Sequence, residues 1–201
     1  ELNEKYGFHA RNDSELAFFL LEKKGISAIE EFDGVYAFCY WKQNKVYLAR
    51  DLFGVKPIWY SLDDNLAFCS EKKALINQKI QNIDELNPSV ILEYDTVSKK
   101  TNVVNRKFFE ITPEFELTHK ELILKTKDLI LNSIKKRIPD KNFGILFSGG
   151  IDSTVIAYVC KQLGLKFTCY TAAVESAESE APDLVCAKKV AKELGFELKY
   201  K

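Results

Sequence analysis

The sequence lacks several features that would assign it to a broad class at once. It contains no methionine in 201 residues and begins at Glu1, so we expect a processed, partial or incompletely recorded chain. It has no apolar run long enough to cross a bilayer and no recognisable secretory leader. Lys plus Arg equals Asp plus Glu, at 29 each, which gives no indication of nucleic acid or an anionic membrane as a partner. These absences favour a cytoplasmic protein.

Cysteine is present, but not in the patterns that bind metal ions. The five cysteines, Cys39, Cys69, Cys160, Cys169 and Cys186, form no C-x-x-C pair, and four of the five lie inside apolar segments. The sequence therefore predicts free thiols, mostly buried, and no disulfide. His9 and His119 are isolated, so neither is expected to bind a metal ion.

Residues 1–112 have the pattern of a strand-rich domain. One helix is predicted over Ser14–Lys24, with Asp13 or Ser14 as its cap and Gly25 as its stop. Short polar turns separate paired apolar runs, which predict three hairpins. Their strands are Val35–Trp41 with Lys45–Arg50, Pro57–Leu62 with Leu66–Cys69, and Val90–Asp95 with Asn102–Phe109.

Residues 113–201 change character, because helices now alternate with strands. The predicted order is helix, strand, helix, strand, helix: Leu117–Arg137, Phe143–Phe147, Ile151–Leu163, Lys166–Val174 and Ala181–Leu194. Strands that alternate with helices imply parallel βαβ units. We therefore predict two domains of α+β and α/β class, divided near Thr112–Glu114, with antiparallel sheet before the boundary and parallel sheet after it.

The segment from Phe143 to Thr154 reads FGILFSGGIDST and predicts an anion site. A buried strand, a glycine turn and a helix start leave backbone N–H groups free to bind phosphate. Ser148 and Ser153 add hydroxyls, and the carboxylate of Asp152 is compatible with phosphate if Mg²⁺ lies between them. The alternative is that Ser148 or Asp152 only caps the helix while Gly149 and Gly150 make the turn.

The run LFSGGIDST resembles the pyrophosphate-binding loop of ATP pyrophosphatases, and most of all the synthetase domain of glutamine-dependent asparagine synthetases. The resemblance implies a Rossmann-like parallel α/β domain that uses ATP and Mg²⁺. In such a domain Asp152 would bind the Mg²⁺ ion. It implies that Leu146 and Ala172 contact adenine through their backbone. The phosphate-binding residues would be Ser148, Gly149, Gly150, Asp152 and Ser153.

The first half carries a second resemblance, to the class II glutamine amidotransferase domain. The segments FDGVYAFCYW, LARDLFGVKPIWY and FCSEKKAL follow that family's order, which implies an αββα sandwich of the Ntn-hydrolase type. The segment ARNDSE is similar to the family's S-D-T-E, whose aspartate holds the α-amino group of glutamine, and this role would fall to Asp13. The alternative is that Asp13 is the N-cap of the helix that follows it.

The nucleophile of that family is an N-terminal cysteine, whereas position 1 here is Glu1. Cys39 and Cys69 lie on predicted strands and do not fit that role. We therefore expect either that upstream residues are missing from the sequence or that this form does not hydrolyse glutamine.

Together the two resemblances imply ATP-dependent amidation of aspartate to asparagine. The substrate carboxylate would attack ATP to give an acyl-adenylate and pyrophosphate, and ammonia from glutamine would then displace AMP. The partners would be ATP, glutamine and aspartate, and a homodimer is compatible. Two alternatives stay open: an amide ligase or β-lactam-forming cyclase that acts on another acid, and a non-catalytic remnant of the fold that serves as a binding module.

Overall fold

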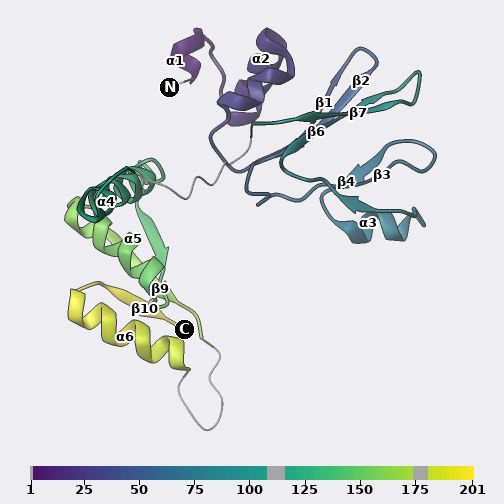
Figure 1. Cartoon of the computed structure of the whole chain (residues 1–201). Coiled ribbons are helices and arrows are strands. Elements are labelled where there is room, and N and C mark those ends of the chain that lie inside the picture. The colour runs from purple at the N-terminus through teal and green to yellow at the C-terminus, as the bar shows by residue number, and fades with distance from the viewer. Residues whose placement is uncertain (1, 108–115, 174–180) are drawn as a thin grey trace. The chain divides into compact units, whose positions relative to one another are not determined.

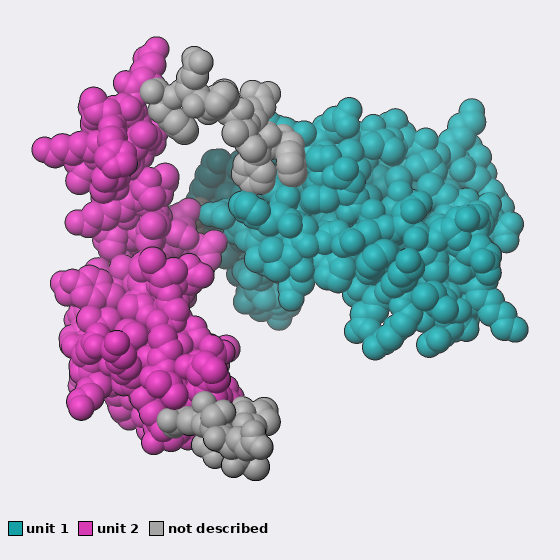
Figure 2. All heavy atoms as spheres, turned by 60° about the horizontal axis from the view of Figure 1, so that its bottom comes forward, with its two compact units in different colours: residues 1–111 teal, residues 112–201 magenta. Residues whose placement is uncertain are grey.

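The computed structural model describes residues 2–107, 116–173 and 181–201. The chain divides into two compact units, Glu1–Ile111 and Thr112–Lys201 (Figures 1 and 2). The boundary predicted at Thr112–Glu114 lies outside the described residues. Within the described residues, no helix has both the length and the apolar composition that crossing a membrane requires.

The described part of unit 1 forms two antiparallel sheets. The larger has the strand order β1-β2-β6-β7, with bounds Ala37–Lys42, Lys45–Arg50, Val90–Asp95 and Thr101–Asn105. The smaller has the order β4-β3-β5, with bounds Ala67–Cys69, Trp59–Ser61 and Asp84–Glu85. The hairpin between β1 and β2 pairs Lys42 with Lys45, so its turn is the polar segment that the sequence predicts.

Helices and sheets of unit 1 pack in layers (Figure 1). Its helical segments are α1, α2, the 3-10 helix η1 and α3, with bounds Leu2–Tyr6, Asp13–Lys24, Gly25–Glu31 and Lys72–Asn77. Leu20 and Leu21 of α2 pack with Tyr40 of β1 on one face of the larger sheet. On the other face, Leu48 and Leu92 pack with Ile58 and Leu86 at the smaller sheet, and α3 lies against β4. The layers are therefore helix, sheet, sheet and helix.

Unit 2 contains a parallel sheet of order β10-β9-β8, with bounds Leu198–Tyr200, Phe167–Thr171 and Phe143–Leu146. Its helices α4, α5 and α6 have the bounds His119–Lys135, Ile151–Gln162 and Pro182–Leu194. Parallel pairing agrees with the βαβ units that the sequence predicts. The last residue of the strand predicted at Lys166–Val174 lies outside the described residues.

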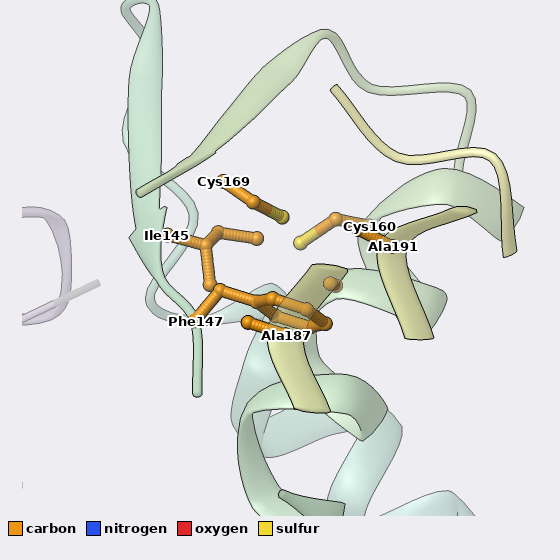
Figure 3. Packing of buried hydrophobic residues seen from close by; sticks show 7 residues of the cluster. Ile145, Phe147, Cys160, Cys169, Ala187 and Ala191 are labelled. Atoms are coloured by element: carbon orange, nitrogen blue, oxygen red, sulfur yellow. The ribbon is translucent and has the colours of Figure 1, made fainter. Parts of the chain in front are cut away.

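The core of unit 2 lies between one face of its sheet and helices α5 and α6 (Figure 3). The small side chains of Ala187 and Ala191 allow α6 to approach the sheet closely. The core residues labelled in Figure 3 are Ile145, Phe147, Cys160, Cys169, Ala187 and Ala191. Side chains alternate between the faces of a strand, so Leu146 and Tyr170 lie on the opposite face. There they are 87% and 43% exposed.

All five cysteines lie in described segments and are free, but fewer are buried than the sequence predicts. Cys160 and Cys169 are buried, and burial raises the pKa of the Cys169 thiol to about 11. The expectation of burial is wrong for Cys39, which is exposed. Cys39 pairs with the fully buried Leu48, yet it belongs to β1 at the edge of the larger sheet, beyond the strands that pack on the smaller sheet.

Candidate functional site

The glycine loop of unit 2, which we define as residues 148–150, connects β8 to α5. Phe147 donates its backbone N–H to the Tyr170 oxygen at 2.8 Å, and the Thr171 hydroxyl donates to the Phe147 oxygen. These bonds hold the end of β8 against β9 just before Ser148. The loop therefore lies at the carboxyl edge of a parallel sheet, where open α/β sheets bind their ligands.

Gly149 has two separate structural reasons to be glycine. Its φ of +76° is in the left-handed region that disfavours a side chain. A Cβ at this position would also lie 2.8 Å from the Ala187 nitrogen and from the Cys186 carbonyl carbon. The loop thus rests directly on the backbone of α6, and the Cys186 thiol donates to the Gly149 oxygen at 3.6 Å.

The two loop hydroxyls predicted to bind phosphate lie close together. Ser148 Oγ is 3.4 Å from Ser153 Oγ and accepts from the Gly150 N–H at 3.3 Å. Ser153 Oγ donates to the Gly150 oxygen at 3.1 Å. Because both hydroxyls can rotate, they can be redirected toward an anion without a change in the backbone.

The start of α5 is not capped by a side chain. Gly150 is its N-cap residue, and no side chain accepts a hydrogen bond from the first turn. Free amides and the positive end of the helix dipole favour an anion there. The alternative in which Ser148 or Asp152 caps this helix is therefore wrong, because neither side chain makes the capping bond.

Asp152 lies in the first turn of α5, where its carboxylate is exposed. It makes no hydrogen bond or ion pair with any residue that the structure describes. No group of three or more His, Cys, Asp or Glu side chains in the described segments could hold a metal ion. Mg²⁺ is commonly held by one or two carboxylates together with substrate phosphates and water, so one free carboxylate beside an anion site fits such an ion.

Leu146 and Ala172 lie at the same edge of the sheet as the loop. Leu146 is the last residue of β8 and pairs with Tyr170 of β9, and Ala172 follows the last residue of β9. The structure therefore brings these two positions and the glycine loop together. The contact with Cys186 and Ala187 could not be predicted from the sequence, because no motif marks a backbone approach between segments so far apart.

Asp13 is not the cap of α2, which corrects one alternative from the sequence. The N-cap is Asn12, whose Oδ1 accepts from the Glu15 N–H at 2.9 Å. Glu15 in turn accepts from Arg11, at 2.6 Å from Nη2 and 2.9 Å from the backbone N–H. The Arg11 guanidinium lowers the pKa of the Glu15 carboxyl. Arg11, Asn12 and Glu15 thus fix the helix start and leave the Asp13 carboxylate free.

Asp13 is one of the residues of helix α2 and strand β1 that line a cavity of about 500 Å³. Asp33 and Cys39 also line this cavity, together with apolar side chains such as Phe18 and Phe38. Asp13 is exposed and has no partner among the described residues. A free carboxylate at an apolar cavity can bind the ammonium group of a small molecule.

Two family models match the chain. The model for the glutamine amidotransferase domain matches residues 1–141, and the model for asparagine synthase matches residues 125–200. The first match covers more than half of the chain. The two matches overlap, and the first extends beyond Ile111, where unit 1 ends.

Curated relatives match both units at once. The chain is 33% identical to a putative glutamine-hydrolyzing asparagine synthetase of Methanocaldococcus jannaschii, over 100% of this chain and 39% of that protein. It is 31% identical to the glutamine-hydrolyzing asparagine synthetase of Gallus gallus, over 98% of this chain and 40% of that protein. The chain therefore spans about two fifths of the length of these relatives.

Among solved structures, a glutamine phosphoribosylpyrophosphate amidotransferase from B. subtilis matches 98% of this chain and 66% of its own, with 11% identity and a TM-score of 0.46. The two family models match in the order glutamine amidotransferase domain, then asparagine synthase, and the curated relatives match across both. The chain belongs to the family of glutamine-dependent asparagine synthetases.

Proposed function

We propose that the protein takes part in ATP-dependent amidation of aspartate to asparagine, with ammonia released from glutamine. In this proposal the aspartate side chain attacks the α-phosphorus of ATP to form β-aspartyl-AMP and pyrophosphate, and ammonia then displaces AMP. The family relationship supports amide formation, and the glycine loop supports the use of a nucleotide. Residues 1–112 would be the glutamine domain of Ntn-hydrolase type, and residues 113–201 the Rossmann-like ATP pyrophosphatase domain.

The observation that carries the proposal is the difference between the two loop glycines. Gly149 must be glycine for reasons within the fold, whereas Gly150 has an ordinary φ of −69°. A Cβ on Gly150 would meet only the Ser148 hydroxyl oxygen, at 3.3 Å. The fold therefore does not require a glycine at position 150. A ligand that approaches the backbone closely, as a phosphate does at a helix start, accounts for it.

The proposed ATP site uses the loop for the phosphates and the adjacent strand ends for adenine. The hydroxyls of Ser148 and Ser153 and the amides at Gly149 and Gly150 would donate to phosphate oxygens, and Asp152 would bind Mg²⁺. When bound, the ion would neutralise charge that develops on the leaving pyrophosphate. Backbone groups of Leu146 and Ala172 would contact adenine. Donors held in place before the reaction stabilise that charge without reorganisation.

In unit 1, Asp13 would hold the α-ammonium group of glutamine at the cavity between α2 and β1. A carboxylate that already caps a helix would have few lone pairs left for this role. Asn12 caps α2 instead, which removes that objection. We assign the nucleophile of glutamine hydrolysis to no cysteine of this chain, because Cys39 and Cys69 both lie on strands.

The proposal is tested with Asp152→Asn in the full-length gene product. The change is expected to leave the unfolding temperature without ligand nearly unchanged, because Asp152 has no hydrogen-bond or ion-pair partner among the described residues. We expect aspartate-dependent ATP–pyrophosphate exchange to fall by about a hundredfold or more, the scale for loss of one preorganised electrostatic group. Asp128→Asn, at an exposed position on α4, is the control and should keep full exchange.

Unchanged exchange in Asp152→Asn would overturn the assignment of the loop. Exchange by the unchanged protein with another carboxylic acid, but not with aspartate, would favour the amide ligase or cyclase. Absence of exchange with every acid tested would favour the non-catalytic remnant.

A further inference from the structure

Thr171, the last residue of β9, is a buried polar residue that the proposed nucleotide site does not use. It is 8% exposed, and no other residue with a hydroxyl, amide or charged side chain is buried in the described part of unit 2. Its hydroxyl donates a hydrogen bond to the Phe147 oxygen. Valine has almost the same shape and fits a strand as well, so packing alone does not account for a hydroxyl at this position.

The Thr171 hydroxyl occupies a place that the backbone of a longer strand pair would fill. Leu146 of β8 pairs with Tyr170 of β9, so one more step would pair Phe147 with Thr171. Half of that step is present, because the Phe147 N–H donates to the Tyr170 oxygen at 2.8 Å. In a regular parallel ladder the Phe147 oxygen would accept from the Ala172 N–H. Here it accepts from the Thr171 hydroxyl instead, and β8 ends at Leu146.

The first consequence concerns the Ala172 N–H group. Within the described residues it makes no backbone hydrogen bond, whereas the next residue, Ala173, donates to the Lys201 oxygen at 3.2 Å. Ala172 follows the last residue of β9, so it keeps, at the carboxyl edge of the sheet, a donor that no described backbone group uses. An N–H group there can bind a ring nitrogen of a base, as the proposed adenine contact requires.

The second consequence concerns the direction of the Ser148 N–H group. Every described peptide is trans, and the C=O and N–H bonds of a trans peptide point in opposite directions. Because the Phe147 C=O points to β9, the Ser148 N–H points away from β9. In the same way the Cys186 thiol binds the Gly149 C=O, so the Gly150 N–H points away from α6. Ser148 and Gly150 are both exposed, as an anion site on their amides requires.

We propose that Thr171 is a positioning residue for nucleotide binding, through the hydrogen bond that its hydroxyl donates to Phe147. The bond keeps the Ala172 N–H available for adenine and holds the Ser148 N–H toward the phosphates. Without the hydroxyl, the Phe147 oxygen would accept from Ala172, and the strand pair would be one step longer. The proposal rests on the proposed nucleotide site and adds a residue that lies outside the loop motif. Every contact that it uses lies within unit 2.

The test measures ATP binding by the full-length gene product with isothermal titration calorimetry, in the presence of Mg²⁺. Thr171→Val should weaken ATP binding by about tenfold, the scale for one or two lost hydrogen bonds to the nucleotide. Its unfolding temperature without ATP should stay nearly unchanged, because the Phe147 oxygen gains the Ala172 N–H as its partner. Thr171→Ser keeps the hydroxyl and should bind ATP within about twofold of the unchanged protein.

Thr168→Val is the matched control, because it removes a hydroxyl from the same strand. The Thr168 hydroxyl donates to Glu197 at 3.3 Å and makes no bond with the loop, so this variant should bind ATP normally. Aspartate-dependent ATP–pyrophosphate exchange gives a second measurement. In that assay Thr171→Val should raise the KM for ATP by about tenfold and leave the KM for aspartate unchanged.

The proposal is overturned if Thr171→Val binds ATP as tightly as the unchanged protein, or if Thr171→Ser loses as much affinity as Thr171→Val. A lower unfolding temperature with normal ATP binding would show that the hydroxyl only stabilises the strand pair. Failure of the proposed function would give another result. If the unchanged protein binds ATP but shows no exchange with aspartate, the function fails, and a loss of affinity in Thr171→Val still supports the role of Thr171. Absence of ATP binding by the unchanged protein would overturn both.

Discussion

The two units each contain a turn that combines an aspartate with a glycine of positive φ, and the two turns use the aspartate in opposite ways. In unit 1, Asp51 is 2% exposed and accepts from the amides of Val55 and Lys56, each at 3.0 Å. Gly54, at φ +65°, lies within this turn and accepts a hydrogen bond from Arg50. In unit 2, Asp152 is exposed and accepts from no amide of its loop.

The difference shows how similar residue types give either a self-contained turn or a binding site. Burial alone would raise the pKa of Asp51, but the amides of Val55 and Lys56 hold that pKa below its usual value. The turn in unit 1 thus uses its aspartate to bind the amides of Val55 and Lys56 within the turn. The turn in unit 2 rests on α6, and its Gly150 amide donates only to the rotatable Ser148 hydroxyl, so this amide and the Asp152 carboxylate can both turn to a ligand.

The largest effect that separates the turns is expected from alanine substitution of the loop glycines. Gly149→Ala should lower the free energy of unfolding of unit 2 by about 3 kcal/mol, because it combines backbone strain with a backbone clash. Gly150→Ala should change it by about 0.5 kcal/mol or less. Both tryptophans, Trp41 and Trp59, belong to unit 1, so amide hydrogen exchange in α5 and β8 is the suitable measurement. Equal losses in the two variants would contradict the contact with α6.

The second effect concerns the turn of unit 1. Asp51→Asn should destabilise unit 1 by about 2 kcal/mol, because the buried amide side chain has one acceptor oxygen for the two N–H groups of Val55 and Lys56. Denaturant unfolding followed by the fluorescence of Trp41 and Trp59 reports on this unit. Asp152→Asn is the control and should leave the fluorescence transition in place. If Asp51→Asn has no effect either, the two turns do not differ as described.

A third, smaller effect tests whether unit 1 also contains a carboxylate that is free for a ligand. Asp13, like Asp152, lies in the first turn of a helix whose N-cap position is held by another residue, Asn12 in α2 and Gly150 in α5. In the full-length protein, Asp13→Asn should raise the KM for glutamine by about tenfold, the scale of one lost charge-assisted hydrogen bond. Synthesis with ammonia should be unchanged. A parallel loss of both activities would show that Asp13 has a structural role.

The smallest effect is expected at Glu31, a carboxylate whose partners are internal, as those of Asp51 are. Lys24, Lys5 and Tyr6 all donate to it, and they lower its pKa from 4.5 to about 2. Because the folded-state pKa is depressed, the stabilisation is present above pH 4.5 and is lost as the pH falls toward about 2. Since this cluster lies at the surface, the contribution is small and weakens with salt.

Glu31→Gln is the variant that measures this contribution. It should be less stable than the unchanged protein at neutral pH, and the difference should vanish near pH 2, where Glu31 itself becomes protonated. Urea unfolding at several pH values, read by tryptophan fluorescence, gives the curve, with Glu30→Gln as the neighbouring control. A difference that does not depend on pH would contradict the shifted pKa.

Strong local patterns predicted much of this fold. The strands Lys45–Arg50 and Val90–Asp95 have the predicted bounds, because alternating side chains meet clear polar turns at both ends. The cap of α2 could not be placed, because Asn12, Asp13 and Ser14 are all good capping residues. Strand β10 was not predicted, since three residues with Lys199 at the centre carry no periodic signal. It forms only because β9 offers a free edge.

The candidate site shows the same limit. The residue types of the loop indicated an anion site, but the contact between Gly149 and α6 joins positions 37 residues apart. No local pattern of charge or hydropathy reports such a contact. The exposure of Cys39 could not be predicted from local pattern either, because it depends on which strands of the larger sheet the smaller sheet covers.

The contact between Gly149 and α6 has a consequence for synthesis of the protein on the ribosome. Chains are made from the N-terminus and fold as their parts emerge, so β8 and α5 leave the ribosome before α6 exists. Until Cys186 and Ala187 have emerged, the turn at Gly149 lacks the backbone against which it packs. A nascent chain that ends before α6 would therefore contain every residue of the loop motif without its final shape, and the proposed nucleotide site would form only after that helix docks.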